Sequence, residues 1–200
     1  MTARDDMLAR IRAALADHPA TPTVPREYHR TLPDADVVGL FAERVADYRA
    51  TVRRVSPAEL PGAIAEALRG RVVVPAGLPP EWLAAADVEP LHDDPPLSVE
   101  ELDRADGVVS GCAVAIALTG TIILDGGTAQ GRRALTLLPD HHLCVVRADQ
   151  IVGTVAEALT RLDPSRPQTW ISGPSATSDI ELNRVEGVHG PRNLAVLIVS

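Results

Sequence analysis

Hydrophobic positions in the first fifty residues follow helical spacing in two separate stretches. A helix predicted over residues 5–16 carries its apolar side chains on one face, at Met7, Leu8, Ile11 and Leu15. A second predicted helix does the same with Val38, Phe41, Val45 and Tyr48. Residues 18–33, between the two, contain four prolines and little periodicity, which is typical of an extended linker. We therefore expect residues 1–50 to form an N-terminal helical extension with a linker.

From residue 51 onward, short apolar runs alternate with helical segments. Patterns S/T-x-x-E at residues 56–59 and 98–101 are capping boxes, which predict helices ending near Gly70 and Ala105. A third helix is predicted over residues 151–162, with Val152, Val155, Leu159 and Leu162 on one face. Runs typical of strands cover residues 52–55, 71–74, 108–109, 113–118, 121–124, 143–146, 169–172 and 194–199. This alternation predicts one α/β domain with a layered sheet over residues 51–200.

Composition narrows the functional classes. Acidic residues outnumber basic ones, 27 to 19, for a net charge of −8, so the chain lacks the basic surface of a nucleic-acid-binding or membrane-surface protein. All the basic residues are arginine, which excludes a Schiff-base lysine and a Walker lysine. Aromatic residues make up 2% of the chain, too few for base stacking. No apolar stretch is long enough for a signal peptide or a membrane span.

The two cysteines, Cys112 and Cys144, are too few for a four-thiolate site. We therefore expect no iron–sulfur cluster and no structural zinc held by this chain alone. His142 and Cys144 share a face of a predicted strand, which supplies at most two ligands. The purified protein should accordingly carry no tightly bound metal. Low cysteine usage and the absence of a leader predict a reduced, cytoplasmic protein.

Candidate chemistry lies where glycines follow predicted strands, since open α/β sheets bind ligands at such corners. The first corner is Thr119, Gly120 and Thr121, whose hydroxyls suit an anion; a plain hairpin turn is the alternative. The second joins Gly126 and Gly127 to Arg132 and Arg133. A guanidinium group is a bidentate donor for phosphate or carboxylate, and the alternative is an exposed loop.

A third segment runs from a strand into small residues and a predicted helix start. It supplies Gly173, Ser175, Thr177 and Ser178 as anion ligands, with Asp179 and Glu181 as candidates for proton transfer. The alternative is a helix cap, because residues 178–181 form a capping box. Beyond it, His189 is a candidate acid or base and Arg192 a candidate anion ligand, although a Gly-Pro turn also explains this stretch.

Four stretches together resemble the LUD-domain family of lactate-utilisation proteins: GCAVAIALTGTIIL, GRRALTLLPDHHLCVV, DQIV and ISGPSATSDIELNRVEGVHGPRNLAVLIV. The resemblance covers most of residues 105–200. It implies a three-layer α/β/α fold of the type shared by ribose-5-phosphate isomerase, glucosamine-6-phosphate deaminase and CoA transferases. It also implies a part in the conversion of L-lactate to pyruvate, alongside partner proteins that carry iron–sulfur centres. One departure is Leu118, where many relatives place an acidic residue before Thr-Gly-Thr.

Two readings of function follow. In the first, a small anionic or phosphorylated ligand lies between the Thr119–Thr121 corner and the 173–181 loop, clamped by Arg132 or Arg133. In the second, the same loops form the partner surface of a non-catalytic assembly subunit of a lactate-oxidising complex. An independent sugar-phosphate isomerase or CoA transferase is a weaker alternative that rests on fold analogy. The sequence leaves the oligomeric state and any organic cofactor open.

Overall fold

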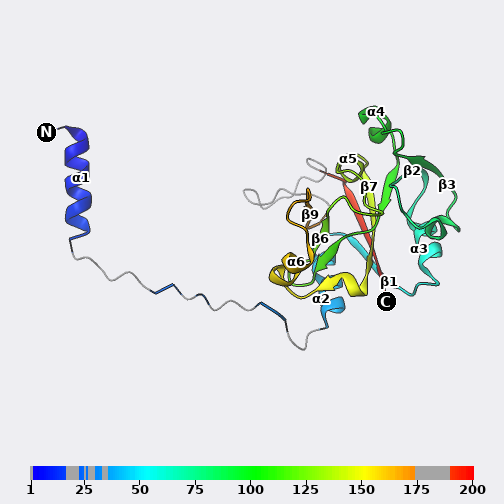
Figure 1. Cartoon of the computed structure of the whole chain (residues 1–200), viewed down its shortest axis with the longest axis horizontal. Helices are drawn as coiled ribbons and strands as arrows, with labels where there is room; N and C mark the ends of the chain where they lie inside the picture. The colour runs from blue at the N-terminus through cyan, green and yellow to red at the C-terminus, as the bar shows by residue number, and fades with distance from the viewer. Residues whose placement is uncertain (1, 17–22, 25, 27–29, 33–35, 174–189) are drawn as a thin grey trace.

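The computed structural model describes residues 2–16, 23–24, 26, 30–32, 36–173 and 190–200 (Figure 1). A larger sheet has the strand order β1-β10-β7-β4-β2-β3, and every pairing in it is parallel. Its strands are β1 (Thr51–Val55), β2 (Gly70–Val74), β3 (Val88–His92), β4 (Gly107–Ser110), β7 (His141–Arg147) and β10 (Asn193–Val199). Strands β7 and β10 are buried over most of their length because both faces of the sheet are covered.

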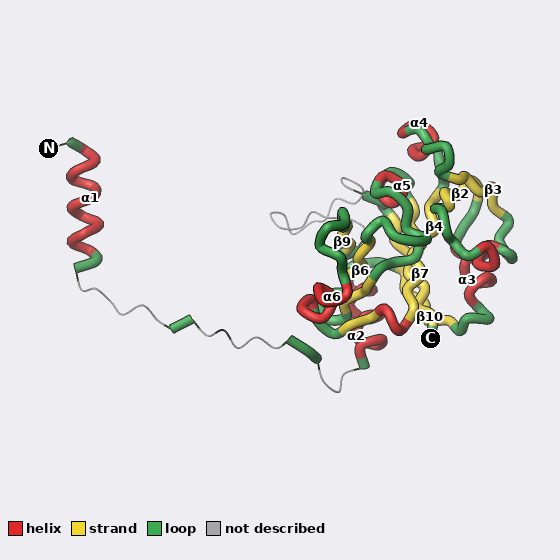
Figure 2. The backbone as a smooth tube through the Cα atoms, in the orientation of Figure 1, coloured by secondary structure: helices red, strands yellow, loops and turns green. Residues whose placement is uncertain are grey.

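A second, smaller sheet has the order β8-β5-β6-β9. It consists of β8 (Ile151–Val152), β5 (Val114–Ile116), β6 (Thr121–Leu124) and β9 (Thr169–Ile171). The pairings β5–β6 and β6–β9 are antiparallel, whereas β5–β8 is parallel. Figure 2 shows the strands of both sheets at the centre of the domain with helices around them.

The helices cover the sheets in layers. One face of the larger sheet packs against α3 (Leu60–Ala67), and the opposite face packs against the second sheet and α2 (Val37–Asp47). The outer face of the second sheet is covered by α6 (Val155–Arg161). Near β2 and β4, the shorter helices α4 (Val99–Asp103) and α5 (Ala134–Leu137) complete the cover. The 3-10 turns are η1 (Pro80–Leu83) and η2 (Ala148–Gln150).

This arrangement confirms the predicted α/β class and the predicted strands. The capping box at residues 98–101 is present as predicted, with Ser98 accepting from Glu101 N and Glu101 accepting from Ser98 N. The second sheet is an addition, since the apolar runs of β5 and β6 give no sign of which sheet they join. Strand β3 was missed because Pro90 and Glu89 interrupt its apolar pattern, as is common at a sheet edge.

The helix predicted over residues 151–162 was wrong at its start. Ile151 and Val152 form β8, and α6 begins after Thr154, which is the true N-cap. The Thr154 hydroxyl accepts from Glu157 N at 3.2 Å, and the Glu157 carboxylate accepts from Thr154 N at 2.8 Å. Of the four residues predicted to share a face, Val152 and Leu162 are buried together with Ala158, whereas Val155 and Leu159 are exposed.

The N-terminal extension divides into two parts. Helix α1 (Ala3–Ala14) has no buried residue and lies apart from the sheets in Figure 1. Helix α2, in contrast, buries Phe41 and Val45 completely in the main core. The boundary at residue 50 stays a prediction, and the burial of α2 argues for a division earlier in the chain. No helix in the described ranges has the length and apolar character needed to span a bilayer.

Candidate functional site

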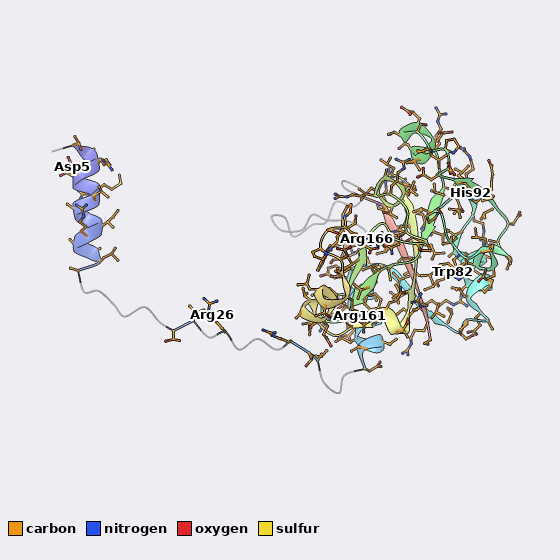
Figure 3. All side chains as sticks on the ribbon, in the orientation of Figure 1. Asp5, Arg26, Trp82, His92, Arg161 and Arg166 are labelled. Carbon is orange, nitrogen blue, oxygen red and sulfur yellow. The ribbon has the colours of Figure 1, made fainter. Side chains whose placement is uncertain are left out.

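A cavity of about 620 Å³ opens at the carboxyl ends of β2 and β3. Ligands of open α/β sheets bind at this edge, and the volume falls in the usual range for small-molecule sites. One part of its wall is apolar, from Val74, Leu135 and Pro167. The polar part of its wall consists of His92, Asp93, Asp94, Asp125, Arg132 and Arg166. Figure 3 labels His92 and Arg166, which come from different elements of the domain.

Arg132 lies in the wall of the cavity and binds Asp93, the residue after β3. Its Nε donates to Asp93 Oδ2 at 2.8 Å and its Nη2 to Asp93 Oδ1 at 2.9 Å. The same Nη2 donates to the Leu97 carbonyl at 2.6 Å. Arg132 itself is exposed, with 41% of its side chain accessible, whereas the Asp93 carboxylate that it binds is only 14% exposed.

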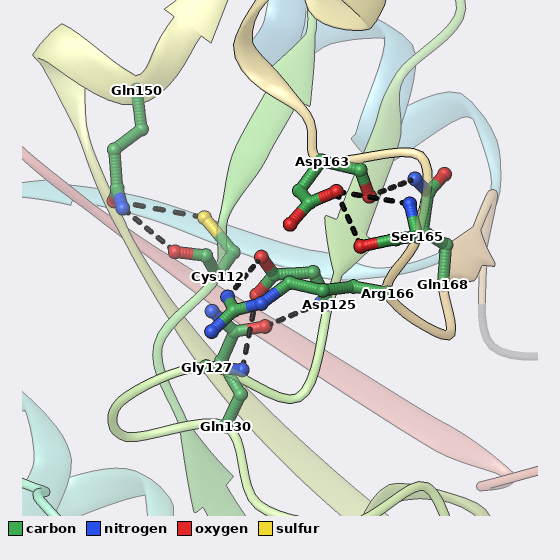
Figure 4. Close-up of polar contacts among 9 residues, drawn as sticks. All are labelled: Cys112, Asp125, Gly127, Gln130, Gln150, Asp163, Ser165, Arg166 and Gln168. Carbon is green, nitrogen blue, oxygen red and sulfur yellow. Dashed lines mark hydrogen bonds and ion pairs between the residues drawn. The ribbon is translucent and has the colours of Figure 1, made fainter.

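Arg166 lies in another part of the cavity wall and binds Asp125, the residue after β6 (Figure 4). Arg166 Nη1 donates to Asp125 Oδ2 at 2.7 Å, and Gly127 N donates to Asp125 Oδ1 at 3.0 Å. The backbone N–H of Asp125 donates in turn to Gln130 Oε1 at 2.7 Å. Both carboxylate oxygens are therefore occupied, and the network fixes the glycine-rich loop that lines the cavity.

These contacts set the charge state of the cavity. The hydrogen bond from Arg132 lowers the pKa of Asp93 and raises the pKa of Arg132 itself. Burial alone would raise the pKa of Asp125, but the hydrogen bonds from Arg166 and Gly127 outweigh it and lower that pKa. Both pairs are consequently ionised at neutral pH. With Asp94 included, three carboxylates face two guanidinium groups.

The remaining hydrogen-bonding capacity determines what the cavity can bind. Arg132 Nη1 makes no hydrogen bond to any part of the chain that the structure describes, so its two N–H groups can donate to a ligand. Because the three carboxylates of the lining outnumber its two guanidinium groups, a singly charged carboxylate is repelled less than a phosphate and fits the lining better. The apolar wall of Val74 and Leu135 suits a short carbon skeleton.

A second group of predicted residues forms the β5–β6 corner. Thr119 Oγ1 and Thr121 Oγ1 are 2.7 Å apart, and Thr121 Oγ1 is 2.8 Å from Ser172 Oγ. This chain of hydroxyls joins the corner to the residue before Gly173, as the first reading of function required. Gly120, at φ +59°, lies against the backbone of Arg44 in α2, so close packing explains this glycine without a ligand.

The structure separates these residues from the cavity. Gly126 and Arg132 both line the cavity, whereas Gly127 is not part of its lining. They follow β6, and the Thr119–Thr121 corner lies at the start of that strand. The two ends of β6 are roughly 10 Å apart, so one small ligand does not reach both. Arg133 is exposed and lies outside the cavity lining. Arg192 pairs with Asp140 at the amino ends of β10 and β7, the opposite edge of the parallel sheet.

Six predicted residues lie outside the described part of the chain. They are Ser175, Thr177, Ser178, Asp179, Glu181 and His189. Their roles in anion binding and proton transfer stay predictions.

The pair His142 and Cys144 forms no metal site in the described residues. Within the described ranges, no three His, Cys, Asp or Glu side chains come together as a metal would require. His142 instead shares a hydrogen bond with Ser110, Nε2 to Oγ at 2.8 Å, inside the core. The thiols of Cys112 and Cys144 are unpaired and buried, and contact with Cys144 and burial both raise the pKa of Cys112. The expectation of no bound metal stays a prediction.

Sequence reasoning missed four polar residues of the cavity: His92, Asp93, Asp94 and Arg166. His92 ends β3, the strand that went unrecognised, Asp93 and Asp94 follow it, and Arg166 lies in the loop between α6 and β9. The available signal was the acidic pair at the end of a short strand-like run, since carboxyl ends of parallel strands are where ligands bind.

Comparisons with known proteins agree on one family. A family model described as the LUD domain matches residues 98–199. Lactate utilization protein C of Deinococcus radiodurans is 54% identical over 99% of this chain and 96% of its own length. The uncharacterized protein YkgG of Escherichia coli K12 is 32% identical over 54% of this chain and 51% of its own. A crystal structure of a DUF162 family protein from Deinococcus radiodurans is 51% identical, with a TM-score of 0.72 over 87% of this chain and 100% of that one.

Proposed function

Since the chain belongs to the LUD-domain family, we propose that it is a component of L-lactate utilisation that binds a small anionic ligand in the cavity beside Arg132. A role in lactate utilisation is supported by the name of the Deinococcus radiodurans relative, which matches almost the whole chain. The conversion that we propose within it is that of L-lactate to pyruvate. The observation that carries the ligand proposal is the Nη1 of Arg132, which bonds to no described residue and is held at the cavity wall by Asp93.

The cavity favours a carboxylate among the small anions. A carboxylate can accept from Arg132 Nη1 while its carbon skeleton lies on Val74 and Leu135. Because the guanidinium group is already oriented by two hydrogen bonds, little side-chain entropy is lost when the ligand binds. A phosphorylated ligand stays within the proposal, but it would place a second negative charge near Asp93, Asp94 and Asp125.

The partners belong to the same proposal. We propose that the electrons from lactate pass to iron–sulfur proteins of the same system, as the resemblance to the LUD-domain family implies. The two cysteines of this chain are too few for a four-thiolate cluster of its own. We place the chain in the cytoplasm with them, which is supported by its two unpaired thiols.

The test compares two variants that break the same ion pair from opposite sides. Arg132→Ala removes the guanidinium, whereas Asp93→Asn leaves it in place with an N–H group facing it. Calorimetric titration with L-lactate, pyruvate and inorganic phosphate measures the affinity of each variant. If Arg132 holds the anion, Arg132→Ala weakens binding by about tenfold or more, and Asp93→Asn keeps binding within about threefold, since a charge-assisted hydrogen bond contributes about 1.5–3 kcal/mol.

The second candidate function is the non-catalytic assembly subunit. It is favoured by the fact that both cavity arginines already bind the protein's own carboxylates, as a purely structural ion pair would. Under this reading none of the three anions binds, and the two variants lower stability equally. Growth on L-lactate of a strain lacking the gene, complemented with Arg132→Ala, separates the two: an assembly subunit restores growth with this variant, and a ligand-binding one does not.

A further inference from the structure

Helix α1 carries an apolar stripe that nothing in the described structure covers. Met7, Ile11 and Leu15 recur every four residues and are all exposed, Met7 by 63%. The helix is nevertheless well formed at its start, with Thr2 and Asp5 capping each other reciprocally. A helix of this length is marginal in water by itself, and most helical stability comes from packing of the apolar face. The exposed stripe therefore indicates that α1 packs against another apolar surface.

A matching apolar surface lies on the outside of the second sheet. We define the α6 patch as Leu118, Val155 and Leu159, all exposed. Val155 and Leu159 are four residues apart and so lie on the same side of α6. Leu118 is brought beside them because its N–H donates to the Gly153 carbonyl at 3.1 Å, just before α6 begins.

The linker from α1 is attached to the domain at the edge of this patch. The Thr154 hydroxyl donates to the Arg30 carbonyl at 2.6 Å. Leu32 lies against Gly153 so closely that a Cβ there would be 2.7 Å from Leu32 Cβ. Residues 30–32 thus meet the domain at the first residues of α6. The fourteen residues 16–29 can extend to roughly 45 Å, which is ample for α1 to reach any part of α6.

We propose that α1 docks on the α6 patch of its own chain, with Met7, Ile11 and Leu15 against Leu118, Val155 and Leu159. The attachment at Arg30 makes this an intramolecular contact, for which a short tether supplies an effective concentration in the millimolar range. Docking buries both exposed apolar surfaces away from water. Because the tether already holds them in one molecule, little entropy is lost when they associate. A second copy or another protein has no such advantage at micromolar concentration.

The test joins the two surfaces covalently. The variant Ile11→Cys/Leu159→Cys places one thiol on each surface, and a short bis-maleimide then reports their proximity. Cys112 and Cys144 are buried and stay unreactive. The matched control is Ala13→Cys/Leu159→Cys, with the first thiol on the opposite side of α1. We expect intramolecular cross-linking about tenfold faster in the first variant than in the control, at a rate independent of protein concentration.

Two further outcomes decide the proposal. Met7→Glu added to the first variant should bring its rate down to the control value, because a charge in the stripe prevents docking. Equal rates in the first variant and the control would overturn the proposal. Cross-linked dimers whose yield rises with protein concentration would also overturn it and assign the patch to a second copy.

Discussion

At the scale of single residues, burial decides the chemistry of His142. The imidazole projects from β7 into the core, where it is 1% exposed and has Ser110 as its hydrogen-bond partner. Burial and then the neighbouring His141 lower the pKa of His142 to about 3. The ring is therefore neutral at physiological pH. Its partner among the described residues is Ser110, and we assign it a structural role.

The lowered pKa of His142 has a measurable consequence for stability. In the unfolded chain the imidazole takes up a proton near pH 6.5, but in the folded chain only near pH 3. The unfolded state thus binds more protons between these values, and stability is lost as the pH falls from 6.5 towards 3, by up to about 1.4 kcal/mol per pH unit. Urea unfolding at pH 7, 6 and 5 measures the slope.

The control is His142→Gln, which should flatten the pH dependence over the same range. Because burial also lowers the pKa of His141, the comparison is made in a His141→Gln background. Carboxylates with lowered pKa values, such as Asp93 and Asp125, lose their stabilising effect only below pH 4 and do not interfere. An imidazole resonance of His142 that titrates near pH 6.5 would contradict the assignment.

At the scale of elements, the β5–β6 turn depends on a glycine for two reasons. Gly120 has φ +59°, and a Cβ there would be 2.8 Å from the backbone carbon of Arg44 in α2. Gly126 has a similar φ of +69°, but its nearest atom would be 3.7 Å away. The two positions therefore share the backbone strain and differ in available space.

We expect Gly126→Ala to cost about 1 kcal/mol, the strain of a left-handed alanine. Gly120→Ala should cost about 3 kcal/mol or more, because α2 must also move away from the turn. Thermal and urea unfolding of both variants measure the difference. Equal losses of stability in the two variants would show that α2 can move away from the turn without a free-energy cost, and that it packs loosely there.

The elements also show how far local sequence patterns reach. Strand β6 and helix α4 were predicted within about one or two residues, because a capping box and a short apolar run are local signals. The start of α6 was misjudged because Ile151 and Val152 continue the apolar pattern of a helix, although Thr154 and Glu157 mark the true start. The glycine loop at Gly126 was identified for the same local reason. Its partners Asp93 and Arg166 were not, since ion pairs that join residues 39 and 41 positions apart leave no local pattern.

At the scale of the whole molecule, the described residues of the N-terminal extension show two contacts with the domain before β1. Residues 30–32 lie on the start of α6, and α2 buries Phe41 and Val45 in the main core. The two contacts differ in kind. The first is a hydrogen bond and one leucine at the surface, whereas the second is part of the central hydrophobic cluster. The part of the chain that the domain needs to fold should accordingly begin between them.

Two truncated chains separate the contribution of the first contact from that of α1. A chain that begins at residue 30 keeps the Arg30 carbonyl and Leu32, and one that begins at residue 36 loses both while keeping α2. Since neither contains α1, any docking of that helix cancels in the comparison. Both should melt cooperatively, the second about 2–4 °C lower, which corresponds to about 1 kcal/mol in a domain of this size. Equal melting temperatures would show that residues 30–32 contribute nothing to stability, and loss of cooperative melting in either chain would show that the extension belongs to the core.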